Sequence, residues 1–161
     1  MAGFTLVELV TVMVLIGILS VVAIPHFMDR IFDERGFRDA VKAAVQHARR
    51  SAVASRRFSC VNVTAGTGSA GIVAIFRDTA APEAVGAVNC ATAIALPVPG
   101  KGCASTNQVC APNGVTLGGG SLIFDPLGRS VTAPDVLAAV VTLTVSNQTD
   151  ITIQPETGYV Q

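Results

Sequence analysis

The sequence has no tryptophan, one tyrosine and two histidines, and aromatic residues make up only 5% of its 161 positions. Charged residues are also scarce at 14%, and basic and acidic side chains balance at 11 each. This balance gives no sign of a nucleic-acid partner or an acidic partner for the molecule as a whole. The length fits about one domain.

Groupings typical of catalytic sites are missing as well. His26 and His47 have no serine or cysteine beside them in a catalytic arrangement, and paired carboxylates, a glycine phosphate loop and a metal cluster are absent. We interpret Asp125 and Asp135, which flank a turn, as solvated turn residues, and the GGGS run at 118–121 as a flexible loop. We therefore expect no catalytic residue, no metal and no organic cofactor, and we do not expect an enzyme.

The cysteines are Cys60, Cys90, Cys103 and Cys110, an even number without CxxC spacing, which argues against a zinc site. Beside an apolar N-terminal run, they predict a non-cytoplasmic domain with two disulfides. The sequence leaves three pairings open. We favour Cys103–Cys110, which closes a short loop, together with Cys60–Cys90. The alternative is four reduced cysteines that are buried as small apolar residues.

Residues 4–24 form an apolar run that would be about 31 Å long as a helix, enough to cross a bilayer. A cleaved secretory signal would have a basic start and a small-x-small site behind a shorter core, so we interpret the run as a retained span. Glu8 lies inside it, although a carboxylate at the bilayer centre costs roughly 2.5–3.5 kcal/mol. Gly17 and Pro25 lower helix propensity, and Pro25 predicts a kink or local melting.

Charge is distributed unevenly after this run. Residues 29–57 hold eight basic and four acidic side chains, whereas residues 58–161 hold three and six. Apolar residues at spacings of three and four predict one buried helical stripe. The residues of this stripe are Phe37, Val41, Ala44, Val45, Ala48 and Ala52. We expect one long helix that ends near Ser55.

Basic residues outside this stripe form a candidate contact face, in a run without acids from Ala40 onward. They are Lys42, Arg49, Arg50, Arg56 and Arg57. Such a face can neutralise phosphates in a salt-dependent way. We favour instead a solvated helix face or contacts with acidic surfaces of neighbouring subunits.

From Phe58 onward the hydrophobic period becomes that of strands. The predicted strands are 58–64, 71–77, 121–124, 138–146, 150–154 and 158–161. Turn residues between the last three favour an antiparallel meander. The Ala/Gly/Pro-rich stretch at 79–120 is long for a loop, which favours a weak strand at 93–98. The predicted fold class is α+β: a long N-terminal helix, transmembrane in its first half, packed on a C-terminal antiparallel sheet.

The stretch from Gly3 to Glu8, GFTLVE, followed by an apolar run, resembles the signature of type IV pilins and of the pseudopilins of type II secretion. The resemblance implies cleavage by a prepilin peptidase between Gly3 and Phe4 and N-methylation of Phe4. It also implies that Glu8 pairs with the Phe4 amine of a neighbouring subunit and sets the axial register, since a carboxylate in low dielectric is tolerated beside a cation. The alternative for Glu8 is an acid stabilised by the helix dipole near a wet interface.

Three later stretches resemble the H-type pseudopilin and FimT group: residues 47–63, 122–129 and 151–160. The resemblance implies a pilin-like division of the chain. Its parts are a leader at 1–3, a transmembrane helix at 4–25, an amphipathic continuation at 26–57 and a periplasmic β-rich domain at 58–161.

The implied function is that of a minor pseudopilin of type II secretion, held in the bacterial inner membrane by a single pass with its C-terminal domain in the periplasm. The implied partners are other pseudopilins, a prepilin peptidase, the assembly platform and ATPase, and membrane lipid before assembly. The alternative is a minor pilin of a type IV pilus that acts in assembly priming or DNA uptake. FimT-type DNA binding uses an arginine-bearing tail after the last glycine, and the tail at 158–161 has no arginine, which disfavours DNA.

Overall fold

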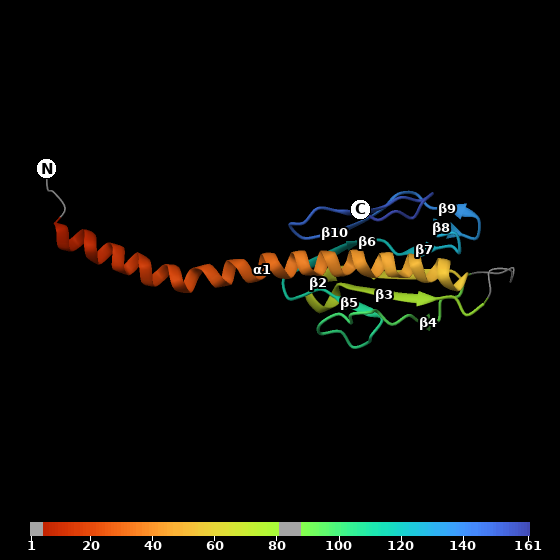
Figure 1. The fold of residues 1–161 in the computed structure, drawn as a ribbon, viewed down its shortest axis with the longest axis horizontal. Coiled ribbons are helices and arrows are strands. Elements are labelled where there is room, and N and C mark those ends of the chain that lie inside the picture. Colours follow the sequence, from red (N-terminus) through yellow and green to blue (C-terminus); the bar gives the residue numbers. More distant parts are fainter. Residues whose placement is uncertain (1–4, 81–87) are drawn as a thin grey trace. The chain divides into compact units, whose positions relative to one another are not determined.

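The computed structural model describes residues 5–80 and 88–161, without the side chains of residues 21–29 and of Ala133. One long helix, α1 (Leu6–Ser55), is followed by antiparallel strands (Figure 1). The protein is therefore α+β, as the change of hydrophobic period near Phe58 predicts. The contacts divide the chain into two units, residues 1–33 and 34–161, and each is described by itself.

Helix α1 begins at Leu6 because Thr5 caps its first turn. The Oγ1 atom of Thr5 accepts a hydrogen bond from the backbone N–H of Glu8 at 3.3 Å. Thr5 and Glu8 thus hold the two positions of a Thr-x-x-Glu capping box, and a Thr cap is worth about 1 kcal/mol. The helix continues unbroken through Gly17 and Pro25, so Pro25 does not melt it locally. The kink predicted at these two residues stays a prediction.

The described side chains of the first unit, at residues 5–20 and 30–33, are exposed. Every residue from 5 to 20 is exposed, and the large apolar side chains among them range from 48% exposure for Val10 and Val12 to 80% for Leu6. Among the described residues, no helix is both long and apolar enough to cross a membrane. The span predicted at 4–25 includes Phe4 and the side chains of residues 21–25, which lie outside the described part.

In the second unit, residues 34–161, the predicted helical stripe is confirmed. All six of its residues are buried: Phe37, Val41, Ala44, Val45, Ala48 and Ala52. The helix ends as predicted at Ser55. There Arg56 adopts a left-handed φ of 51°, and the N–H groups of Arg56 and Arg57 donate to the carbonyls of Val53 and Ala52 at 3.4 and 3.2 Å. These two bonds form a Schellman motif, in which arginine occupies the position that glycine usually holds.

The strands form two antiparallel sheets. The first sheet contains, in spatial order, β4 (Thr92–Ala93), β3 (Ile72–Arg77), β1 (Ser59–Thr64), β7 (Leu122–Phe124), β8 (Ser130–Ala133) and β9 (Val136–Leu137), with β5 (Gln108–Cys110) also paired to β3. The second sheet contains β11 (Ile151–Ile153), β10 (Val141–Val145), β6 (Thr116–Gly119) and β2 (Gly66–Thr67), and a 3₁₀ turn, η1 (Gly68–Ala70), follows β2. Figure 1 shows the second half of α1 lying along these strands.

Both sheets contribute to one hydrophobic core around the helical stripe. Ile75 and Phe124 of the first sheet and Leu143 and Ile151 of the second are fully buried. Val160, near the C-terminus, joins the same core and bridges Ile153. Burying a side chain of this size is worth about 1.5–3 kcal/mol, so packing on α1 holds the two sheets together.

The predicted strands at 58–64, 71–77, 121–124 and 150–154 match β1, β3, β7 and β11 closely. The terminal meander is confirmed, because β10 pairs with β11 and residue 160 bridges to residue 153. The strand predicted at 138–146 begins only at residue 141, because residues 138–140 carry the chain from the first sheet to the second.

The interpretation of the GGGS run as a flexible loop was wrong. Gly118 and Gly119 belong to β6 and lie opposite Thr144 and Leu143 of β10. A β-carbon on Gly118 would overlap Oγ1 of Thr144, and one on Gly119 would lie 2.6 Å from Cδ2 of Leu143. Glycine therefore serves here to let two strands approach closely.

Candidate functional site

The candidate assembly site at the N-terminus is described from Thr5 onward, so the predicted cleavage and methylation site at Gly3 and Phe4 lies outside the described residues. Glu8 is exposed in the first helical turn and is the acid of that turn. Its backbone N–H is capped by Thr5, whereas its carboxylate has no hydrogen bond or ion pair among the described residues. A helix that is apolar on every side requires an apolar partner or lipid around it, and Glu8 lies inside that surface.

Two disulfides brace the second unit, as predicted. Cys60 pairs with Cys90, and Cys103 pairs with Cys110. The first bond joins strand β1 to the segment before β4, and the second closes the loop before β5. Two bonds of this kind in one small domain are typical of a non-cytoplasmic compartment.

The five basic residues predicted as a contact face differ in their exposure and in their hydrogen bonds. The Nε of Arg49 donates to the carbonyl of Gly128 at 3.2 Å, and Nη1 of Arg57 donates to the carbonyl of Thr79 at 2.6 Å. Lys42 is half-buried, whereas Arg50 and Arg56 are exposed. Arg49 and Arg57 therefore serve the fold. Arg50 and Arg56 carry the accessible positive charge of the predicted set.

A junction of three segments surrounds Arg49, and we call it the turn junction. Gly128, in the turn between β7 and β8, and Gly158, in the terminal turn, have φ values of 81° and 59°. A β-carbon on Gly128 would lie 3.1 Å from Cγ2 of Val53, and one on Gly158 would overlap the carbonyl oxygen of Gly128. Helix α1 and two distant turns therefore meet without space for another atom. Sequence reasoning singled out both turns but did not predict that they touch.

The helix enters the second unit through polar contacts that sequence reasoning missed. Glu34 is only 2% exposed and accepts a hydrogen bond from Nδ2 of Asn147 at 3.0 Å. One turn further on, Nε of Arg38 donates to the carbonyl of Thr149 at 2.7 Å. Both contacts hold the turn between β10 and β11 against α1. The burial of Glu34 could have been predicted from its position, because it lies three residues before Phe37 and so continues the apolar stripe.

The interpretation of Asp125 as a solvated turn residue was wrong. Asp125 is 3% exposed, and its Oδ1 accepts hydrogen bonds from the N–H groups of Leu127 and Arg129 at 3.0 and 2.8 Å. Its Oδ2 accepts from Nε of Arg129 at 2.6 Å. The carboxylate is buried because the turn supplies enough donors to replace water. Asp135, in contrast, is solvated, with a side chain that is 97% exposed.

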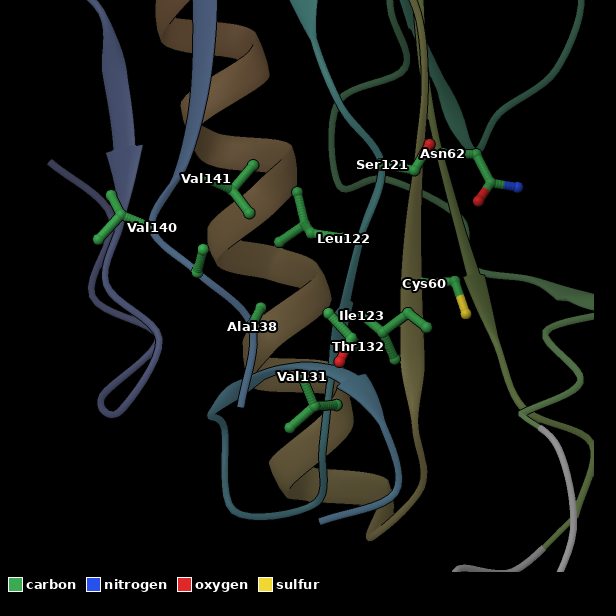
Figure 2. Close-up of a pocket in the computed structure, with 11 residues that line it drawn as sticks. Cys60, Asn62, Ser121, Leu122, Ile123, Val131, Thr132, Ala138, Val140 and Val141 are labelled. Carbon is green, nitrogen blue, oxygen red and sulfur yellow. The ribbon is translucent and has the colours of Figure 1, made fainter. Parts of the chain in front are cut away.

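A groove of about 470 Å³ opens where the chain passes between the two sheets. Figure 2 shows Ile123 and Thr132 on one side and Ala138, Val140 and Val141 on the other. Its lining has no charged side chain, and its polar side chains are Asn62, Ser121 and Thr132. This lining offers neither an acid–base pair nor a nucleophile with a base.

No group of three metal-ligating side chains comes together in residues 5–80 and 88–161. No family model, curated protein or solved structure matches the chain.

Proposed function

We propose that this chain is a structural minor pseudopilin of a type II secretion system, assembling through its N-terminal helix into a periplasmic pseudopilus. The observation that supports this proposal is the helix at residues 6–20, which exposes apolar side chains on every side and carries Glu8 as its acid. Such a surface is suited to lipid before assembly and to neighbouring helices afterwards.

Glu8 would give this helical surface a fixed register. After cleavage behind Gly3, the α-amine of Phe4 on one subunit would meet the carboxylate of Glu8 on the next. An ion pair in a low-dielectric bundle is tolerated when both charges are satisfied, whereas an isolated carboxylate is strongly disfavoured. Only registers that bring the two groups together would therefore be stable. The second unit, braced by its disulfides, would contact partner subunits or cargo.

The partners of this function are a prepilin peptidase that acts at Gly3–Phe4, an assembly platform with its ATPase, and other pseudopilins. The chain would lie in the inner membrane of a bacterium with two membranes, with residues 58–161 in the periplasm. A minor pilin of a type IV pilus would use the same N-terminal chemistry and is the alternative.

The test is deletion of the gene in its host, with exoprotein secretion, surface pili and DNA uptake measured side by side. Loss of secretion with intact pili is expected. Loss of pili with intact secretion would replace this proposal by the minor-pilin alternative. Normal secretion, pili and DNA uptake would contradict both.

Complementation with Thr5 and Glu8 variants separates the two roles available to Glu8. Glu8→Gln should enter the membrane but fail to restore secretion, because it removes the charge and keeps the shape. Thr5→Val removes the cap seen at 3.3 Å and keeps the charge, so it should restore secretion. The reverse pattern would assign the motif to helix capping instead of register. Mass spectrometry of the mature chain should also find Met1–Gly3 removed and one methyl group on Phe4.

A further inference from the structure

The turn junction presents exposed apolar side chains beside exposed cations. Val53 of α1, Leu127 of the β7–β8 turn and Tyr159 of the terminal segment are 47%, 72% and 58% exposed. Val53 lies against Gly128, and Gly158 lies against the carbonyl of Gly128, so the segments that carry these three side chains meet at one place. Isolated exposed apolar residues need no explanation, but several on segments that meet at one junction are consistent with an interaction surface.

Two exposed cations lie at this junction. Arg50 and Arg56 flank Val53 at three residues on either side, both are exposed, and neither forms an ion pair among the described residues. The sequence has no acid from residue 40 to residue 77, and the exposed acid of the terminal turn, Glu156, forms no ion pair with either arginine among the described residues. In the β7–β8 turn, Asp125 contacts Arg129 at 2.6 Å, and Asp135, between β8 and β9, contacts the same arginine at 3.6 Å.

The side chains at the junction are those that protein interfaces favour. Tyrosine and arginine are enriched in interfaces and among their hot spots, and Leu127 adds exposed apolar area beside them. The surface is also held in place, because the Arg49–Gly128 bond and the two left-handed glycines fix the turns on the helix. A partner would therefore bind without first ordering these segments.

We propose that the surface formed by Arg50, Val53, Arg56, Leu127 and Tyr159 docks an acidic segment of a partner protein that also carries apolar side chains. Carboxylates of the partner would pair with Arg50 and Arg56, and its apolar residues would cover Leu127 and Tyr159. This surface is distinct from residues 6–20 of α1, and its binding does not require the filament role.

The test uses the full chain in lipid nanodiscs and measures the fluorescence anisotropy of labelled probes at roughly 0.15 M salt. The main probe is a short peptide of alternating glutamate and leucine. Its controls are the glutamine–leucine peptide and a single-stranded DNA oligonucleotide. The glutamate–leucine peptide should bind about tenfold more tightly than the glutamine–leucine peptide, since charge complementarity contributes specificity at such a surface. Equal binding of the two peptides would overturn the proposal.

Variants of exposed residues then locate the site. The double variant Arg50→Gln/Arg56→Gln should weaken binding of the acidic peptide about tenfold, and Leu127→Ser should weaken it as well. Lys101→Gln, which removes an exposed cation from the turn just before the second disulfide, should leave it unchanged. Glu156→Gln should strengthen it, because Glu156 is an exposed acid in the terminal turn.

Circular dichroism is the check that each variant is folded. The variants should fold, because the substituted side chains are exposed in the native chain. An equal loss in Lys101→Gln would mean that only overall charge matters and would overturn the proposal. Tighter binding of the DNA oligonucleotide that depends on the same two arginines would also overturn it and assign the surface to nucleic acid.

Discussion

Replacement of Gly158 by alanine tests whether the turn junction stabilises the fold. Gly158 has a φ of 59°, a conformation in which a β-carbon costs about 1 kcal/mol relative to glycine. The added methyl group would also overlap the carbonyl oxygen of Gly128 and lie 2.9 Å from Nε of Arg49. Forcing these segments apart costs a further 1–3 kcal/mol or so, by analogy with overpacked cores. We expect the free energy of unfolding to fall by about 3 kcal/mol in total.

Gly102→Ala is the matched control, because Gly102 has a φ of 78° but no atom within 4 Å of the added carbon. This variant should lose only the conformational part, about 1 kcal/mol. The assay is guanidinium unfolding of the full chain in detergent, followed by circular dichroism, with an unchanged slope as the check on two-state behaviour. Equal losses in the free energy of unfolding would refute the reasoning, because the overlap of the added methyl group with Gly128 and Arg49 would then cost nothing.

Arg56→Gly should raise the free energy of unfolding by about 1 kcal/mol, because Arg56 holds the left-handed position at the helix end; a lower guanidinium midpoint would contradict this. Joint replacement of Cys60 and Cys90 by alanine should cost about 3–4 kcal/mol, since the bond closes a loop with a sequence separation of 30. An unchanged thermal midpoint would rule out that contribution. Asp125→Asn should cost about 2 kcal/mol through its buried hydrogen bonds, whereas Asp135→Asn should leave the midpoint unchanged. Equal midpoints for the two variants would count against a buried role for Asp125.

Hydrophobic period predicted the helix and the longest strands because burial alone decides those positions. The apolar stripe that includes Val41 and Val45 had to face the hydrophobic core. The β-branched residues of β1 and β3 fit a sheet with one buried face. Strand β6 was missed because two of its four residues are glycines. Their role depends on how closely Thr144 approaches, which is a property of the partner strand and not of the local sequence.

Some features of the candidate sites could be predicted from the local sequence, whereas others depend on contacts that form only in the folded chain. Loop length and compartment were enough to favour the disulfide pairs that the structure contains, because the choice of pairing could be made from the positions of the four cysteines alone. The burial of Asp125 depends on donors from Leu127 and Arg129 in the folded turn, and composition does not indicate their direction. The bond from Arg49 to Gly128 joins residues 79 positions apart. A charge pattern along the helix therefore could not separate Arg49 from its exposed neighbour Arg50.

The position of Val160 in the core has a consequence for synthesis of the chain. The buried stripe of α1 is complete once residue 52 has been made, yet its packing partners extend to residue 160. At about 5–20 residues per second, the stripe waits roughly 5–20 seconds for its last partner. During that time Val41 and Val45 have only an incomplete sheet to cover them. The second unit therefore completes its folding only after residue 160 has been made, and until then the apolar stripe of its helix is open to aggregation.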